Sequence, residues 1–291
     1  SKYFYDAHGS ALFVRITELP EYYPTRTELA ILTQAAPRLA LLAKDVGTVV
    51  EYGSGDGRKS QALLQALPCC KAYVPVEISG DALVGQVARL RAALPALTVM
   101  PLEADFTHPF KLPAGLPSGP RMGFFPGSTI GNLVPADAVD LLRGAQETLG
   151  DDALFVLGVD LKKPLERLIP AYDDPAGVTA AFNLNLLARL NRELGADFML
   201  DRFQHSVRYD AGRGRIEMHL ESLCDQEVAL GGQRFTFRRG ETIHTENSHK
   251  FTLEEASLLA RAGGWEPVET FCDAENLFAV LLLAATCRDQ P

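Results

Sequence analysis

Short apolar runs alternate with amphipathic stretches over residues 46–161 of this 291-residue chain, and this alternation restricts the fold more than any other feature. The apolar runs end in turn-forming residues, as buried strands do, and the stretches between them place apolar residues at helical spacing. Continuously apolar strands joined by helices predict a parallel, doubly wound α/β sheet covered on both faces. The apolar runs are VGTVVEYG (46–53), AYVPVEIS (72–79), TVMPLEADF (98–106), RMGFFPGS (121–128) and ALFVLGVDL (153–161).

A different pattern occupies residues 164–249. A helical stretch follows the DDP turn at residues 173–175, and segments with a period of two residues come after it. Residues 202–223 are expected to form a hairpin that turns at DAGRG (210–214). In this hairpin Ile216, Met218 and Leu220 share one face, and Glu217, His219 and Glu221 share the other.

The strand and helix pattern returns after residue 252. LEEASLLARAGGW (253–265) is typical of a helix that ends in glycines, and EPVETFCD (266–273) and NLFAVLLLAATC (276–287) are typical of two final strands. The sequence therefore predicts an α+β domain inserted into the α/β domain before its last two strands.

The charge balance favours a small-molecule ligand. Lys and Arg total 28 against 37 Asp and Glu, so the net charge is −9. Binding a nucleic acid requires clustered cations, and we expect no nucleic-acid partner. No uncharged run reaches the roughly 18 to 20 residues of a membrane span, and the N-terminal stretch SKYFYDAHGSALF has no long apolar run with a small-residue cleavage site. We expect a cytoplasmic monomer with no membrane partner, whose five cysteines are reduced packing residues.

The strongest short motif is VVEYGSGDGRKS (49–60), a strand that runs directly into Gly53, Gly55 and Gly57. Arg58 occupies the third-glycine place of the dinucleotide fingerprint, which disfavours a nicotinamide-dependent dehydrogenase. Bare backbone at a helix N-terminus suits instead the amino-acid end of a nucleoside ligand without pyrophosphate, and S-adenosylmethionine is such a ligand.

Acidic residues follow the next two predicted strands. Glu77 ends the second strand, where a carboxylate can accept hydrogen bonds from both ribose hydroxyls. Asp105 and Phe106 follow the third strand and suit an adenine amino group and ring face. Because the carboxyl ends of parallel strands meet at one edge of the sheet, these residues and the glycine loop predict an S-adenosylmethionine site there.

Six motifs are spread along almost the whole chain: YFYDAHGSALF, ITELPEYYPTRTE, EYGSGDGRKS, FFPGSTIGNL, AYDDPAGVTAAFN and TENSHKF. Together they resemble the L-histidine Nα-methyltransferases of ergothioneine biosynthesis. The resemblance implies a Rossmann-like class I methyltransferase sheet over residues 46–163 and 250–291, and a second α+β, substrate-binding domain over residues 1–45 and 164–249. It implies trimethylation of the histidine amino group to hercynine, the first step of that pathway.

The same resemblance assigns roles to individual residues. Those implied to bind S-adenosylmethionine are Gly53, Lys59, Glu77, Asp105 and Phe106, and Gly55 of the same loop is included with them. Those implied to bind histidine are Tyr22, Asn132, Tyr172, Glu246 and Ser248, with Met218 lining the side-chain pocket and Tyr5 near the amino group. The chain departs from the expected pattern at Tyr52, where an aliphatic residue is expected, at Glu77, which is an aspartate in some relatives, and at His249.

The stretch IHTENSHKF (243–251) raises the choice between a metal site and a ligand clamp. In a regular strand His244, Glu246 and Ser248 point one way, whereas Thr245, Asn247 and His249 point the other, so His244 and His249 cannot bind one metal. Methyl transfer from a sulfonium needs no Lewis acid, and we expect no metal. Glu246 can accept an imidazole N–H, and Ser248 can donate or accept, so a clamp for a histidine ring is predicted.

Tyr5 and Asn132 are the candidates to orient the reacting amine, and no obligate general base is assigned. Two alternatives stay open. One is a methyltransferase of the same fold that acts on another aromatic amino acid or amine, to which Glu246 offers a test, because an indole gives this carboxylate less to bind. The other is a catalytically silent protein that binds S-adenosylmethionine without consuming it.

Overall fold

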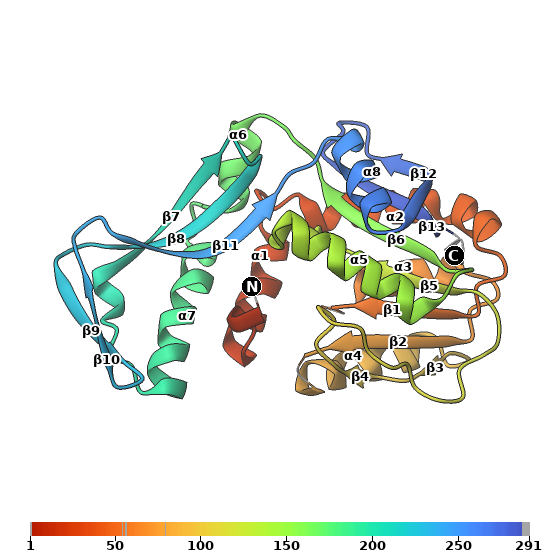
Figure 1. Cartoon of the computed structure of the whole chain (residues 1–291), viewed down its shortest axis with the longest axis horizontal. Coiled ribbons are helices and arrows are strands. Elements are labelled where there is room, and N and C mark those ends of the chain that lie inside the picture. The colour runs from red at the N-terminus through yellow and green to blue at the C-terminus, as the bar shows by residue number, and fades with distance from the viewer. Residues whose placement is uncertain (1, 54, 56, 79, 287–291) are drawn as a thin grey trace, which may run out of the picture. The chain divides into compact units, whose positions relative to one another are not determined.

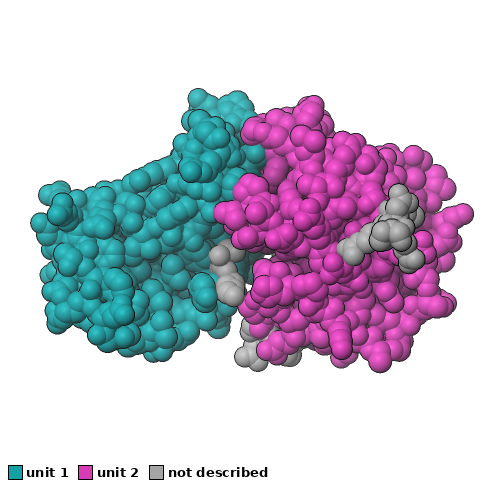
Figure 2. All heavy atoms as spheres, in the orientation of Figure 1, with its two compact units in different colours: residues 1–23, 163–250 teal, residues 24–162, 251–291 magenta. Residues whose placement is uncertain are grey.

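The computed structural model describes residues 2–53, 55, 57–78 and 80–286, and these form two compact units. Unit 1 consists of Ser1–Tyr23 and Lys163–Lys250, and unit 2 consists of Pro24–Lys162 and Phe251–Pro291 (Figure 2). Each unit is thus assembled from two separate segments of the chain. Among the described residues, no helix has both the length and the apolar character needed to cross a membrane.

Unit 2 is built on a mixed eight-stranded sheet (Figure 1). Its strands are β1 (Thr48–Tyr52), β2 (Ala72–Glu77), β3 (Thr98–Val99), β4 (Leu102–Glu103), β5 (Arg121–Phe125), β6 (Leu154–Asp160), β12 (Trp265–Cys272) and β13 (Phe278–Ala285). The order is β12-β13-β6-β5-β1-β2-β3, with β4 also paired to β2. From β1 the chain first extends the sheet through β2 and then returns to β5, so the strand order reverses beside β1.

The sheet is parallel only in part. Strands β1, β2, β3, β5 and β6 pair in parallel, as predicted, but β13 runs antiparallel to both β6 and β12. The short link over residues 273–277 between β12 and β13 explains this difference, because two strands joined so closely pair as antiparallel neighbours. The third apolar run also differs from the prediction, since it forms two short strands, β3 and β4, on either side of Pro101.

Helices cover both faces of this sheet. One face packs against α5 (Pro135–Leu149) and α8 (Leu253–Ala262), and the other packs against α2 (Pro24–Leu42), α3 (Arg58–Ala66) and α4 (Gly80–Ala93). Neighbouring residues of β1 belong to opposite layers, because Val50 faces the first group of helices and Val49 the second. A short 3-10 helix, η2 (Thr129–Asn132), follows β5.

The first unit boundary differs from the sequence prediction, which ended the N-terminal segment of the second domain at residue 45. The structure places the boundary at Tyr23–Pro24, because α2 packs on the sheet of unit 2. Ile31, Leu32 and Leu39 of α2 are buried in the same core cluster as strand residues of β1, β5 and β13. An amphipathic helix belongs to the core that buries its apolar side, and here that core is the sheet.

Unit 1 combines helices with a three-stranded antiparallel sheet in the order β11-β8-β7 and a two-stranded ribbon, β10-β9. The predicted hairpin is present as β7 and β8, which pair from Phe203↔Ser222 to Asp210↔Arg215. The elements of unit 1 are η1 (Lys2–Phe4), α1 (Ala7–Glu18), α6 (Leu165–Leu168), η3 (Ile169–Ala171), α7 (Val178–Leu194), η4 (Leu200–Arg202), β7 (Phe203–Asp210), β8 (Arg215–Ser222), β9 (Gln226–Leu230), β10 (Gln233–Phe237) and β11 (Thr242–His249).

A β-bulge interrupts β11, and it corrects the predicted faces of this strand. His244 pairs with His219, but Glu246 pairs with Met218, so Thr245 is the extra residue. Met218 and His219 point to opposite faces of β8, so His244 and Glu246 do as well. The expectation that His244 shares a face with Glu246 and Ser248 is therefore wrong. Glu246 and Ser248 do share a face, since they pair with Met218 and Ile216.

Candidate functional site

The glycine loop of unit 2 joins β1 to α3. Gly53, Gly55 and Gly57 have φ angles of 76°, 51° and 78°, a backbone conformation that side chains with a Cβ rarely adopt. A Cβ on Gly55 would meet nothing within 4 Å. The loop therefore offers open backbone at the N-terminus of α3, where N–H groups favour a negatively charged or polar ligand group.

The other residues predicted to bind the cofactor follow strands next to β1. Glu77 is the last residue of β2, and Asp105 and Phe106 come just after β4. Asp105 accepts hydrogen bonds from the backbone N–H (3.1 Å) and the hydroxyl (2.6 Å) of Thr107. The Phe106 ring lies 3.5 Å from the position of a Cβ on Gly53. Since β2 pairs with both β1 and β4, these residues lie at the same edge of the sheet.

Asn132 is also in unit 2, at the end of η2. The turn before it begins with Ser128, a non-glycine residue with φ of 56°. The Ser128 hydroxyl accepts a hydrogen bond of 2.9 Å from the Asp160 backbone N–H, and this contact holds the left-handed turn against β6. The turn at Ser128 thus fixes the position of η2, and with it the position of Asn132, relative to β6.

Lys59 depends on a partner that the sequence analysis missed. The Glu28 carboxylate of α2 is fully buried, lies 2.6 Å from Lys59 Nζ and accepts the Gly127 N–H at 2.8 Å. A Cβ on Gly158 would stand 2.0 Å from Glu28 Oε1, so β6 needs glycine at this position to admit the carboxylate. A long-range ion pair of this kind has no local sequence signal, which is why Glu28 was not found.

Glu51 is a second buried carboxyl group near the loop. It accepts hydrogen bonds from the Ser60 hydroxyl (2.5 Å) and from the Tyr73 hydroxyl. Burial raises the pKa of Glu51 to about 8, although these two donors and Lys59 oppose the rise. Glu51, which lies on β1 just before the glycine loop, therefore organises the interior of unit 2 beneath that loop.

In unit 1, four residues predicted to contact histidine meet in or beside one apolar cluster. Met218 is buried in this cluster with Phe4, Phe182 and neighbours, and Tyr22 and Tyr172 pack against it half-buried. Tyr5 lies at its margin, where its ring makes edge contacts with Phe13 (5.6 Å between ring centroids) and Phe182 (5.8 Å). The residues come from the N-terminal segment, the turn before α7, and β8, so the fold gathers distant parts of the chain.

Polar groups of β11 adjoin this cluster. Ser248 and Tyr172 are joined by a hydrogen bond of 2.8 Å between their hydroxyl oxygens. Lys250, which is buried, donates to the Tyr172 hydroxyl at 2.6 Å and to the Ser248 hydroxyl at 2.8 Å. Burial raises the pKa of Glu246 to about 7, and the Lys250 ammonium works against this rise. Lys250 belongs to the TENSHKF motif, yet the sequence analysis gave it no role.

A chain of hydrogen bonds through Asn183 and His205 reaches the backbone carbonyl of Tyr172. The Asn183 side-chain amide donates to the His219 carbonyl at 3.0 Å and lies 2.9 Å from His205 Nδ1. With Nδ1 accepting from that amide, His205 Nε2 donates to the Tyr172 carbonyl at 2.8 Å. These contacts fix the turn that carries Tyr172, and they too were absent from the sequence predictions because they link α7 to β7 and β8.

The predicted residues therefore fall into two groups. Tyr5, Tyr22, Tyr172, Met218, Glu246 and Ser248 lie in unit 1, whereas Gly53, Gly55, Lys59, Glu77, Asp105, Phe106 and Asn132 lie in unit 2. Each group occupies a coherent part of its own unit. Polar donors and acceptors beside an aromatic cluster can select a flat polar ring, and an open glycine loop beside carboxylates can hold a nucleoside.

Residues 1–285 match the family described as histidine-specific, SAM-dependent methyltransferases. The chain belongs to this histidine-specific methyltransferase family. The family and fold are those of an enzyme that uses S-adenosylmethionine, and the glycine loop in unit 2 fits such a ligand, because open space lies over Gly55 and the edge of an aromatic ring lies beside Gly53.

Two relatives and one solved structure illustrate the range of the histidine-specific methyltransferase family and its fold. The histidine N-alpha-methyltransferase of Mycolicibacterium smegmatis is 43% identical over 90% of this chain and 83% of that relative. Ergothioneine biosynthesis protein 1 of Neurospora crassa is 30% identical over 96% of this chain, which spans 32% of that longer relative. The CcbJ methyltransferase of Streptomyces caelestis, at 18% identity, has a TM-score of 0.50 over 88% of this chain and 96% of that chain, and so shares the fold.

Proposed function

We propose that this enzyme transfers three methyl groups from S-adenosylmethionine to the α-amino group of L-histidine and so forms hercynine, the first step of ergothioneine biosynthesis. Membership of the histidine-specific methyltransferase family supports the reaction. The observation that carries the choice of substrate is the polar group of Tyr172, Ser248 and Lys250 beside Met218 and Glu246 in unit 1. This group offers both donors and acceptors to an imidazole ring next to an apolar surface.

Selection of histidine is assigned to Glu246 and Ser248. On one face of β11, the carboxylate accepts one imidazole N–H and the serine hydroxyl serves the other ring nitrogen. Met218 and Tyr22 supply the apolar contacts of the ring. Phenylalanine or leucine would leave these polar groups without hydrogen bonds, which costs about 1 to 3 kcal/mol for each group.

The amino-acid backbone of the substrate is assigned to Tyr172, Asn132 and Tyr5. The Tyr172 hydroxyl, which receives a hydrogen bond from Lys250, can donate to the carboxylate. The Asn132 amide offers a donor and an acceptor, and Tyr5 offers a phenol to the amine. These residues would orient the neutral amine, and orientation is the largest contribution that a protein makes to a displacement of this kind.

S-adenosylmethionine supplies a methyl group already activated on a sulfonium, so this chain's residues supply binding, orientation and exclusion of water. Glu77 is assigned to the ribose hydroxyls, Asp105 and Phe106 to adenine, and Gly53, Gly55 and Lys59 to the amino-acid end. The Glu28 carboxylate keeps Lys59 in place. As the substrate amine becomes more methylated and loses N–H donors, the carboxylate and imidazole contacts hold the intermediates.

Mass spectrometry of the purified protein incubated with S-adenosylmethionine and an equimolar mixture of the protein amino acids tests this proposal. The expected product is histidine carrying three additional methyl groups. Glu246→Ala should weaken the selection of histidine, whereas Asn132→Ala should lower methylation of every accepted amino acid. Equal turnover of histidine and tryptophan by the unaltered protein would rule out the imidazole clamp, and the absence of any methylated product would rule out the reaction.

A further inference from the structure

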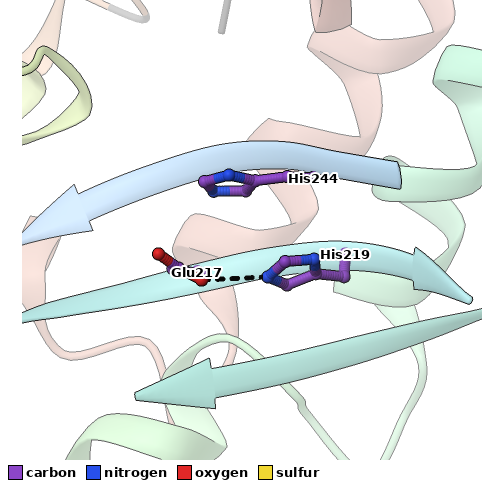
Figure 3. Close-up of side chains that lie close together, drawn as sticks. All are labelled: Glu217, His219 and His244. Carbon is purple, nitrogen blue, oxygen red and sulfur yellow. Dashed lines mark hydrogen bonds and ion pairs between the residues drawn. The ribbon is translucent and has the colours of Figure 1, made fainter. Parts of the chain in front are cut away.

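Glu217, His219 and His244 form a cluster of side chains that the proposed reaction does not use. One potential ligand atom from each residue lies within 4.8 Å of the others. Figure 3 shows the carboxylate and one ring on β8 and the second ring on the neighbouring strand, β11. The three side chains occupy the face of the sheet opposite Met218, Glu246 and Ser248.

The β-bulge creates this cluster. If Thr245 were instead paired in a regular strand, His244 would point to the same face as Glu246, and His219 would have Thr245 and not a histidine opposite it. With the bulge, His219 and His244 are direct cross-strand neighbours, and their rings stack with 4.7 Å between centroids and 15° between planes. Glu217 stands two residues before His219 and therefore shares its face.

The surroundings hold the carboxylate in a position that suits a metal ligand. Arg215 binds Glu217 Oε1 through Nη2 (2.5 Å) and Nε (2.9 Å), and Glu217 Oε2 lies 3.1 Å from His219 Nε2. An outer partner that orients the ligating carboxylate is a regular feature of metal sites. The next cation on this face, Arg208, extends toward Glu221 (3.9 Å).

The buried ring has unsatisfied hydrogen-bonding capacity. His219 is only 6% exposed, and its Nδ1 atom has no hydrogen-bond partner among the described residues. His244 is exposed, so an ion can approach from the solvent over this second ring. Its ring makes a hydrogen bond between Nε2 and the Glu246 carbonyl (3.1 Å).

We propose that Glu217, His219 and His244 form a binding site for a divalent transition-metal ion of the zinc type. Two imidazole nitrogens, one carboxylate oxygen and a water complete the four-coordinate geometry that zinc adopts with such ligands. Zinc–nitrogen bonds of about 2.0 to 2.1 Å require the two nitrogens to approach to roughly 3.3 Å. Rotation of the exposed His244 ring out of the stack brings its nitrogen to the ion, while the Glu217 and His219 side chains stay close to their present positions.

A bound ion joins β8 to β11 by a second set of bonds besides the backbone ladder. A ligand that binds the folded chain and not the unfolded chain raises its stability according to concentration and affinity. Since the two strands also carry Met218, Glu246 and Ser248 on their other face, the ion would stabilise the strand pair that holds the proposed histidine contacts.

Zinc titration of the tag-free, full-length protein after chelator treatment tests the site. Calorimetry is expected to show one zinc ion bound per chain. Zinc chloride at about 50 µM is expected to raise the midpoint temperature of thermal unfolding. His244→Ala removes an exposed ligand and is expected to weaken zinc binding about tenfold or more and to abolish the thermal shift. Glu217→Gln, which keeps the side-chain shape, is expected to weaken binding as well.

His108→Ala is the matched control, because His108 is an exposed histidine outside the cluster. It is expected to bind zinc as the unaltered protein does. Circular dichroism of His244→Ala without zinc checks that the variant folds. Equal affinity of the unaltered protein and His244→Ala would place the ion elsewhere, for example at the adjacent thiols of Cys69 and Cys70, and would overturn the proposal, as would failure of the unaltered protein to bind zinc.

Discussion

Lys250 is a buried cation whose ammonium group donates hydrogen bonds to two hydroxyls. Lys has three donors and no acceptor, so the Tyr172 and Ser248 oxygens accept from its ammonium group, and the two hydroxyls also share a hydrogen bond of 2.8 Å. Burial of an ammonium is costly unless its hydrogen bonds are satisfied. The position of this charge therefore indicates a role in arranging the polar groups that face the substrate.

Lys250→Met is expected to lower kcat/KM for histidine by about ten- to a hundredfold. The change removes charged hydrogen bonds, which contribute about 1.5 to 3 kcal/mol each, from Tyr172 and Ser248. Steady-state kinetics with histidine measures the loss, and calorimetric binding of S-adenosylhomocysteine, expected to be unchanged, checks that unit 2 is intact. Lys44→Met, which alters an exposed lysine, is the control and should keep full activity. Full activity of Lys250→Met would contradict this role.

Glu246 gives the reaction a pH dependence of its own. Burial raises the pKa of Glu246 from 4.5 to about 7, so below pH 7 the group is protonated and above pH 7 it is a carboxylate. The carboxylate is the stronger acceptor for an imidazole N–H. The expected result is a rise of kcat/KM for histidine with an inflection near pH 7 that is absent in Glu246→Gln. The two pH profiles, compared from pH 6 to 9, test this, and parallel profiles would show that Glu246 does not titrate in the site.

The same shift in the pKa of Glu246 affects the free energy of unfolding. The unfolded chain releases this proton near 4.5, whereas the folded chain keeps it until about 7. Between these values the folded state binds more protons, so the contribution of Glu246 to stability falls as the pH rises through this window. The unfavourable ionisation is consistent with a group positioned for binding rather than for folding.

The positions of individual candidate residues were predictable from sequence where they follow a motif. The strand–glycine–helix pattern located Gly53 and Gly55, and the strand ends located Glu77 and Asp105, because the carboxyl ends of parallel strands converge. The roles of Tyr22 and Met218 came only from the family resemblance. Glu28 and Asn183 were not predictable, since each acts through contacts with residues far away in the sequence.

Strand β11 shows how one inserted residue changes what both faces of a strand can do. The bulge at Thr245 separates His244 from Glu246 and gives each a different set of neighbours. The Thr245 hydroxyl donates to the Met218 carbonyl at 2.9 Å, which replaces a ladder contact at the irregularity. The sequence pattern could not reveal the bulge, because Ile-His-Thr-Glu is compatible with a regular strand.

Deletion of Thr245 is expected to retain histidine methylation. The deletion makes His244 and Glu246 successive residues of a regular strand, so they still point to opposite faces and still pair with His219 and Met218. Only the extra residue of the bulge and its hydrogen bond to the Met218 carbonyl are lost. Product formation by mass spectrometry provides the measurement, and Thr245→Ala, which loses only the hydrogen bond, is the control. Loss of methylation in a deletion variant that still binds S-adenosylhomocysteine would show that the faces of His244 and Glu246 alone do not determine activity.

Most other elements were predictable, and the exceptions have identifiable physical causes. The strands β1, β2, β5 and β6 follow apolar runs that are buried on both faces. The third run was predicted as one strand, but Pro101 cannot donate to a ladder and divides it. Helix α2 was grouped with the wrong domain, because periodicity shows that a helix has an apolar side and not which core receives it.

Each unit of the molecule has its own hydrophobic core. Among the described residues, the apolar clusters of unit 2 contain only residues of that unit, and those of unit 1 contain only residues of the N-terminal segment and the insertion. A segment with its own core can unfold separately from its neighbour. The sole tryptophan of the chain, Trp265, is fully buried in unit 2, where its indole N–H donates to the Leu142 carbonyl at 2.8 Å.

Urea unfolding is therefore expected to depend on the probe. Trp265 fluorescence reports unit 2, and S-adenosylhomocysteine is expected to raise the fluorescence midpoint because it binds the folded form of that unit. Far-UV circular dichroism reports both units and is expected to show an additional transition that this ligand does not move. Coincident transitions by both probes, with and without the ligand, would show instead that the two units unfold as one.

Because the segments of the two units alternate along the chain, the two units are completed at different times during synthesis on the ribosome. Unit 1 has all its residues once Lys250 has emerged, but the sheet of unit 2 waits for β13, which fills the place between β6 and β12. Until then the open edge of β6 and the apolar faces around it have no cover. The interval from the synthesis of β6 to the synthesis of β13 lasts on the order of ten seconds at translation rates of about 5 to 20 residues per second. During this time the nascent chain exposes an apolar surface that ribosome-associated chaperones can bind, and unit 1 has all its residues before unit 2 does.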